Sequence, residues 1–296
     1  MATIGGDTWR GASAPDPPRS RSMAELRIDP AYDGRRLVVF FGVTTLAAMF
    51  AVFATSPQID VEPPPDLLLM LLYAPAVGAV VVAYIGPAVV RVGWPSGWVL
   101  AGLVPPAAAL MVTTMAGLLG VVGFHSEHLG RMLAYAVPFT LIGAALAFGE
   151  EVGWRGFLWP LLRRRTSFWI SALVLAPAWW ATHALLVLVG WYGSVDGLPA
   201  YTVGLVGFVL FAGVLTDRSR SIWPAVVAHG AWNGTVALSF SATGDEENLV
   251  FSGSDALLGA FGWLAATSML LVGLAYAGWH VYGPDPRGGR EETGPR

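Results

Sequence analysis

The chain has 296 residues, of which 55% are apolar and 12% are charged, and it contains no cysteine. Soluble domains average about 45–50% apolar and about 25% charged residues, so the composition predicts a multi-span membrane protein. The absence of cysteine excludes disulfides and thiolate chemistry, and a net charge of −3 argues against nucleic-acid binding because it supplies no basic field.

Two polar tails flank the predicted membrane domain. Residues 1–34 are rich in Pro, Ser, Asp and Arg, and residues 283–296 in Gly, Pro, Arg and Glu, which predicts disorder in both segments. Residues 35–282 are expected to form an all-α, polytopic transmembrane helix bundle. No short apolar core of a cleaved signal peptide is present near the N-terminus, so the first apolar run is expected to be a retained span.

Eight apolar runs are predicted as spans, because about 20 predominantly apolar residues cross a bilayer as a helix. They cover residues 37–54, 67–90, 98–124, 133–162, 168–191, 201–215, 222–241 and 256–282. Pro138 is expected to break or tilt the start of the fourth run, because proline removes a backbone donor. The sixth run is short, which leaves its limits open.

The arginines predict the orientation of these spans. Nearly all of them fall in segments on one side of an eight-span arrangement, whereas the other side holds only Arg131 together with many acidic residues. The positive-inside rule then places both termini in the cytoplasm. Arg163, Arg164 and Arg165 are interpreted as a topological anchor without a chemical role.

A few strongly polar groups fall well inside the apolar runs, and they predict a site. An ionised group at the bilayer centre costs at least about 2.5 kcal/mol and normally faces a protein interior or a wet cavity. The groups are Glu150, Glu151, Arg155, His183, His229 and Asn233. The remaining histidines, His125, His128 and His280, lie in a loop or at run ends and are assigned no catalytic role.

Helical spacing predicts which of these groups share a face. Glu151 and Arg155 are four residues apart with the acid first, the favourable order for an ion pair within one helix. Glu150 points about 100° away and needs a different neighbour, such as a histidine, a water or a metal. His229 and Asn233 are also four apart, so one helix presents an imidazole and an amide together.

Depth in the membrane supports one common cavity. A rise of about 1.5 Å per residue gives overlapping depths near the middle of the bilayer for four groups on three runs, Glu150, His183, His229 and Asn233. Gly149 and Gly153 form a GxxxG pattern that allows another helix to approach closely. Packing is therefore expected to bring the polar groups within reach of one another.

These residue types suit hydrolysis of an amide bond. Glu150 is the candidate general base acting on water, and His183 and His229 are expected to hold that water or to ligate a metal. Asn233 is expected to donate its amide hydrogens to the developing oxyanion. No serine, cysteine or HExxH arrangement indicates a covalent nucleophile or a soluble type of zinc protease.

The order Glu150-Glu151-x-x-x-Arg155, then His183, then His229-x-x-x-Asn233 resembles the CPBP family, whose motifs are EExxxR, FxxxH and HxxxN/D. These CAAX proteases and bacteriocin-processing enzymes are intramembrane endopeptidases, and their eukaryotic members cleave the last three residues from prenylated CAAX proteins. The resemblance covers about residues 140–240.

The resemblance implies a role for each matching residue. Glu150 would activate the water, while His183 and His229 would position it or bind a metal. Asn233 would support the oxyanion, and Glu151 and Arg155 would buttress the site. The sequence departs from the motif at Trp179, where phenylalanine is usual, an aromatic exchange that is expected to keep the wall but to change the size of the pocket.

The site residues and the composition also lead to expectations about the cofactor, the partners and the cellular location. A carboxylate and two imidazoles at Glu150, His183 and His229 predict a divalent metal site, with zinc as the expected ion. The expected partners are the lipid bilayer and a peptide or membrane-anchored protein substrate, of CAAX or bacteriocin type or a membrane-anchored regulator. Arginine without lysine and many Ala, Gly and Pro residues suggest a bacterial source, hence a bacterial cell membrane.

Two other classes of function fit parts of the same pattern. A secondary transporter or proton relay also uses Glu and His within spans, and Gly86-Pro87 and Pro105-Pro106 are typical of broken helices in such proteins. No convincing inverted repeat supports that alternative. A non-catalytic membrane scaffold would have little use for two adjacent buried carboxylates.

Overall fold

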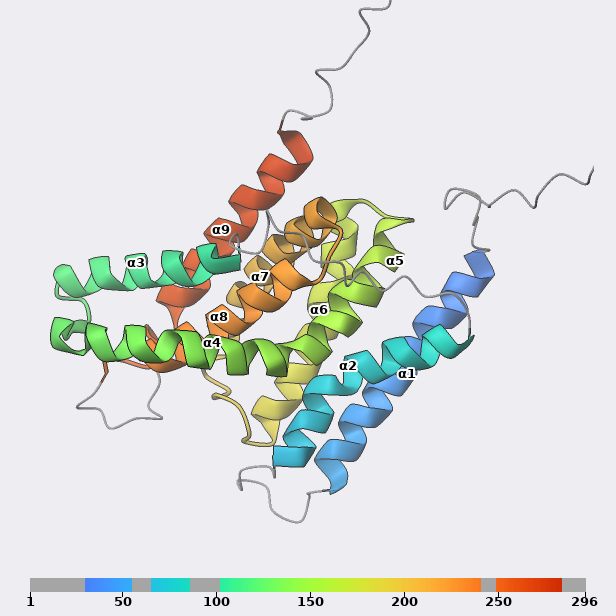
Figure 1. The fold of residues 1–296 in the computed structure, drawn as a ribbon, viewed down its shortest axis with the longest axis horizontal. Coiled ribbons are helices and arrows are strands. Elements are labelled where there is room, and N and C mark those ends of the chain that lie inside the picture. The colour runs from blue at the N-terminus through green and yellow to red at the C-terminus, as the bar shows by residue number, and fades with distance from the viewer. Residues whose placement is uncertain (1–29, 55–64, 86–101, 241–248, 284–296) are drawn as a thin grey trace, which may run out of the picture.

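The computed structural model describes residues 30–54, 65–85, 102–240 and 249–283, and within these ranges the fold is a bundle of α-helices (Figure 1). The helices are α1 Pro30–Ala54, α2 Pro65–Ile85, α3 Val104–Leu118, α4 Leu129–Glu151, α5 Trp159–Arg163, α6 Phe168–Leu188, α7 Leu198–Ser219, α8 Trp223–Phe240 and α9 Trp263–Tyr282. Two short strands, β1 Gly123–Phe124 and β2 Phe251–Ser252, pair antiparallel. The predicted all-α class is confirmed.

Each predicted apolar run contains a helix, and six helical segments among the described residues are long and apolar enough to cross a membrane. Two predicted spans do not meet that measure. Helix α3 has 15 residues, and α8 carries the polar His229 and Asn233 within its 18 residues. The eight-span count and the cytoplasmic placement of both termini therefore remain predictions.

The expected boundaries differ from the observed ones at the first and sixth apolar runs, whereas α9 ends at Tyr282 as expected. Helix α1 begins at Pro30, inside the segment expected to be a tail, and the rest of that tail lies outside the described residues. The C-terminal tail beyond residue 283 also lies outside them. Helix α7 extends from residue 198 to residue 219, longer than the short sixth run.

The fourth run is interrupted at a different place from the one expected. Pro138 lies inside α4 without ending it. The change comes later, where the π-helical segment η3, Val152–Leu158, follows α4 and precedes α5. Pro160 in the first turn of α5 has no N–H and would crowd the carbonyl four residues back in a regular α-helix. A wider π turn just before it relieves that crowding, and such turns are often found at functional sites.

Small residues bring two helices close to the glutamate-bearing segment. A side chain at Gly153 would overlap Pro75 of α2, and one at Gly230 of α8 would overlap Ala144 of α4. Tyr73 of α2 also donates its hydroxyl to the carbonyl of Ala145 at 2.7 Å. The predicted close approach is confirmed, and it packs α2 and α8 closely against the segment that carries Glu150.

The helix ends that the arginines assign to one side of the membrane lie together. Arg163 Nε is 2.9 Å from Asp217 Oδ2, Arg165 Nε is 2.6 Å from Asp33 Oδ2, and His280 Nε2 is 3.2 Å from Asp217 Oδ2. These contacts join the start of α1 to the ends of α5, α7 and α9. Arg163 and Arg165, interpreted from the sequence as topological anchors, therefore have a second role, because both form ion pairs between helical segments.

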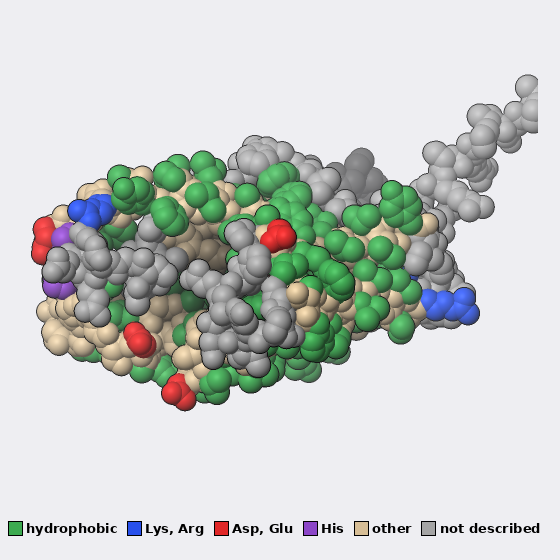
Figure 2. Space-filling view, turned by 90° about the horizontal axis from the view of Figure 1, so that it is seen from below, with side chains coloured by type: hydrophobic (Ala, Val, Ile, Leu, Met, Phe, Trp, Pro, Cys, Tyr) green, Lys and Arg blue, Asp and Glu red, His purple; other side chains and the backbone are tan. Residues whose placement is uncertain are grey.

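The outside of the bundle is apolar over wide areas. Figure 2 shows hydrophobic side chains across much of one face, with few charged groups among them. Large apolar residues such as Leu46, Leu141 and Leu173 are more than 60% exposed. Monomeric soluble proteins rarely expose apolar patches of this extent, so together with the six candidate spans the surface indicates an integral, multi-pass membrane protein.

Candidate active site

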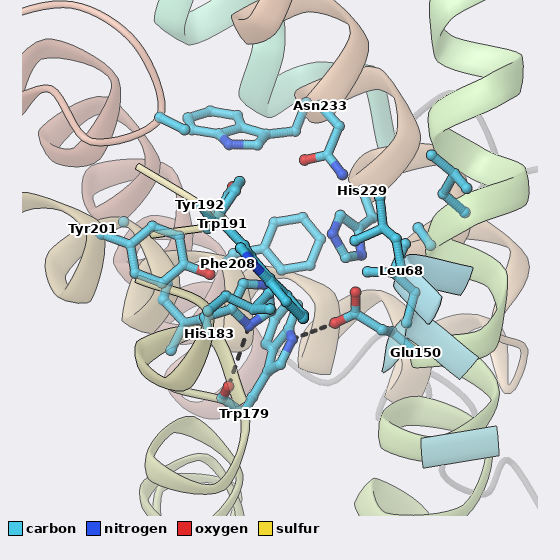
Figure 3. Close-up of a pocket in the computed structure, with 18 residues that line it drawn as sticks. Leu68, Glu150, Trp179, His183, Trp191, Tyr192, Tyr201, Phe208, His229 and Asn233 are labelled. Carbon is cyan, nitrogen blue, oxygen red and sulfur yellow. Dashed lines mark hydrogen bonds between the residues drawn. The ribbon is translucent and has the colours of Figure 1, made fainter. Parts of the chain in front are cut away.

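A cavity of about 250 Å³ lies between α2, α4, α6, α7 and α8. Four of the predicted site residues, carried by three different helices, line it: Glu150, His183, His229 and Asn233. Most of the remaining wall is apolar or aromatic. The expectation that these four groups share one cavity is confirmed, and Figure 3 shows them converging on it.

A hydrogen bond from a side chain on α6 holds the carboxylate of Glu150 in place. The residue is 5% exposed at the C-terminal end of α4, and its Oε2 accepts a hydrogen bond of 2.5 Å from the indole Nε1 of Trp179. Its second carboxylate oxygen faces the cavity (Figure 3). The protein partner of Glu150 is thus an indole, which was not among the neighbours that the sequence suggested, namely a histidine, a water or a metal.

Glu151 lies between Arg155 and His229 and contacts both side chains in the protein interior. Its Oε1 accepts from Arg155 Nη1 at 3.1 Å, as the spacing predicted, and it lies 2.9 Å from His229 Nδ1. Both Glu151 and Arg155 are completely buried. Because an ionised carboxylate only accepts hydrogen bonds, His229 carries a proton on Nδ1 and its Nε2 is left for the cavity.

His183 is oriented in a comparable way by backbone. Its Nδ1 lies 3.3 Å from the carbonyl oxygen of Trp179, one turn earlier on α6. A carbonyl only accepts, so the proton lies on Nδ1 and Nε2 is again the free ring nitrogen. The imidazole packs between two tyrosine rings, with centroids 5.7 Å from Tyr192 and 5.5 Å from Tyr201.

Asn233 completes the polar lining on α8. It lies one helical turn after His229, is half-buried, and points its amide toward the cavity in Figure 3. Glu151 and Arg155 do not line the cavity. The structure therefore separates the six predicted residues into four that face the cavity and a buried pair behind them.

The site fits a metal poorly as it stands. Among the described residues, no group of three His, Cys, Asp or Glu side chains is close enough together to hold a metal ion. The expected zinc site at Glu150, His183 and His229 stays a prediction, and the chemistry proposed below is carried by the protein's own groups.

Sequence reasoning missed three aromatic residues that shape the site. Trp179 was interpreted only as a wall residue, although an indole inside an apolar run needs an acceptor and lies one turn before His183. Tyr192 and Tyr201 also line the cavity. Burial, aided by the nearby Glu150 carboxylate, raises the pKa of Tyr192 to about 12, so its hydroxyl stays protonated at neutral pH.

The part of the chain that carries these residues matches a known protein family. Residues 131–235 match the family described as type II CAAX prenyl endopeptidase Rce1-like. This segment is thus similar to Rce1-like domains. It spans α4 to α8 and contains all six predicted site residues. No curated protein matches the chain.

The Rce1-like match confirms the resemblance stated from the motifs. It indicates a protease, and hence a peptide or protein as substrate. The matched range lies close to the expected core at residues 140–240. Helices α1, α2, α3 and α9 lie outside the Rce1-like range, although α2 contributes Leu68 and Leu72 to the cavity wall.

Proposed function

We propose that the chain is an intramembrane endopeptidase that hydrolyses a peptide bond with water activated by Glu150. The observation that carries the proposal is the shared cavity, which is lined by a carboxylate and two imidazoles, those of Glu150, His183 and His229. Such a set can bind a water molecule through several hydrogen bonds at once. The family match supports a protease.

The proposed reaction starts with the water. His183 Nε2 or His229 Nε2 accepts one of its hydrogens and orients it, while the free oxygen of Glu150 removes the other proton as the water oxygen attacks the carbonyl carbon of the substrate. A new C–O bond forms and the carbonyl oxygen becomes an oxyanion. Asn233 donates its amide hydrogens to that oxyanion.

The second step returns the proton. Glu150 delivers it to the nitrogen of the scissile bond, the C–N bond breaks, and the products leave as a carboxylic acid and an amine. Glu151 and Arg155 act behind the site, because Glu151 fixes the ring of His229 through Nδ1. Orienting a histidine through its second nitrogen is a general way of setting its tautomer.

The cavity wall favours an apolar substrate segment. Leucines from α2, α4, α6 and α7 line the space together with Trp191 and Trp232. We propose a peptide or membrane-anchored protein whose side chains next to the cleaved bond are apolar, of CAAX type or of the bacteriocin and peptide-processing type. Substrate presented from the bilayer would enter such a site without leaving an apolar environment.

The test uses the full chain purified into lipid vesicles. Two fluorogenic peptides are compared, one ending in a farnesylated cysteine and three further residues and one with the same sequence unprenylated, with wild type and Glu150→Gln. In parallel, new peptide termini are compared in membranes holding either form. We expect cleavage by the wild type and none by Glu150→Gln.

Two results would overturn this proposal. Cleavage that persists in folded Glu150→Gln would remove Glu150 as the base. Proton flux into vesicles that depends on Glu150, with no cleaved peptide in either assay, would favour the transporter that the same cluster also suggests.

A further inference from the structure

Trp179 is the residue around which the site is packed. It is 3% exposed, and its ring contacts both histidines edge-on, with centroids 5.8 Å from His183 and 5.4 Å from His229. The guanidinium carbon of Arg155 lies 4.2 Å from the ring centroid. Its indole N–H is the one group in the described structure that donates a hydrogen bond to Glu150.

We propose that Trp179 is a positioning residue for Glu150. Its indole N–H ties one carboxylate oxygen to α6 and so directs the other at the water. This inference rests on the proposed function, in which Glu150 is the base. An indole nitrogen is a donor only, so it holds the oxygen that accepts and does not compete for the proton that Glu150 must take up and release.

The strength of this bond is expected to exceed that of an ordinary side-chain hydrogen bond. Both partners are almost completely buried, and the acceptor belongs to a carboxylate. Hydrogen bonds to ionised groups are shorter and roughly twice as strong as neutral ones. A loose glutamate would sample rotamers in which neither oxygen faces the cavity, and misplacement of about 1 Å can cost about a hundredfold in rate.

The ring of Trp179 also packs against the guanidinium of Arg155. An experiment must separate this contact from the hydrogen bond that the indole donates to Glu150. Arg155 Nε and Nη2 are buried without a hydrogen-bond partner among the described residues, and the ring face below the guanidinium provides an electrostatic partner instead. Through this contact the indole also supports the Glu151–His229 chain. A phenylalanine would keep the face and the edge contacts but would lack the N–H.

Trp179→Phe is therefore the informative variant, and the neighbouring residue provides its control. Trp180 lies on the same helix outside the cavity lining, and its indole donates to Thr202 Oγ1 at 2.9 Å. Trp180→Phe removes an indole N–H of the same kind from a neutral partner. We expect kcat to fall about ten- to a hundredfold in Trp179→Phe with KM nearly unchanged, and both constants to stay within about twofold in Trp180→Phe.

A spectroscopic test does not depend on the substrate. In ¹⁵N-tryptophan spectra of the full chain in micelles, each Phe variant identifies its own indole resonance. We expect the Trp179 indole proton to resonate downfield of that of Trp180, because a carboxylate acceptor deshields it more strongly, and to move upfield in Glu150→Gln.

The outcomes separate this inference from the function on which it rests. Full kcat in Trp179→Phe while Glu150→Gln is inactive would overturn the positioning role and leave the base intact. An indole resonance of Trp179 that is unmoved in Glu150→Gln would overturn it as well. An active Glu150→Gln would instead overturn the proposed function. Loss of folding in Trp179→Phe is recognised by its thermal unfolding, and replacement of Trp179 by benzothienylalanine then removes the N–H while the ring keeps its shape.

Discussion

Arg155→Met tests whether the buried charges behind the cavity act as one unit. Arg155 and Glu151 are both fully buried, and Glu151 Oε1 lies 3.1 Å from Arg155 Nη1. Removing the cation leaves a carboxylate in the apolar interior with only His229 as partner. Breaking a buried ion pair in this way costs about 3–5 kcal/mol of unfolding free energy, which thermal or denaturant unfolding in micelles would measure.

The double variant Glu151→Gln with Arg155→Met removes both charges, and replacing a whole buried pair is often neutral in stability. We expect it to recover most of the lost stability. Cleavage should remain low, because an amide does not hold His229 as a carboxylate does. A double variant less stable than Arg155→Met, or an Arg155→Met protein as stable as the wild type, would refute the reasoning.

Four further predictions follow from the same structure. Asn233→Ala should lower kcat about a hundred- to a thousandfold with little change in KM, and an unchanged kcat would remove the amide from the oxyanion step. Cleavage should persist after chelation, because the proposed reaction uses only the protein's own groups, whereas loss of cleavage on chelation and recovery on added zinc would instead support the zinc site expected from the sequence. The raised pKa of Tyr192, about 12 against 10.0, means that the folded state keeps this proton longer than the unfolded one. Stability should therefore fall as the pH rises from 10 to 12, and unfolding scans of Tyr192→Phe should show a shallower decline. Gly153→Val should destabilise the fold by at least about 1–3 kcal/mol because it overlaps Pro75, while Gly130→Ala in α4, which meets nothing within 4 Å, should unfold like the wild type.

The spacing along single helices could be predicted from the sequence. Glu151 and Arg155 meet as expected, and His229 and Asn233 face one cavity, because helical periodicity is a local property that the chain order determines. Composition likewise determined the membrane class, since the balance of apolar and charged residues does not depend on how the helices are arranged. The order of the motifs was sufficient to indicate the family.

Contacts between helices were decided only by the tertiary structure. The bonds from Trp179 to Glu150 and from His229 to Glu151 join residues on different helices, so they depend on crossing angles and axial offsets that no spacing rule contains. The π-helical segment η3 likewise changes the rotation of everything that follows it. Small residues such as Gly153 and Gly230 indicated close approach, but only the packed helices select which neighbour fills the space.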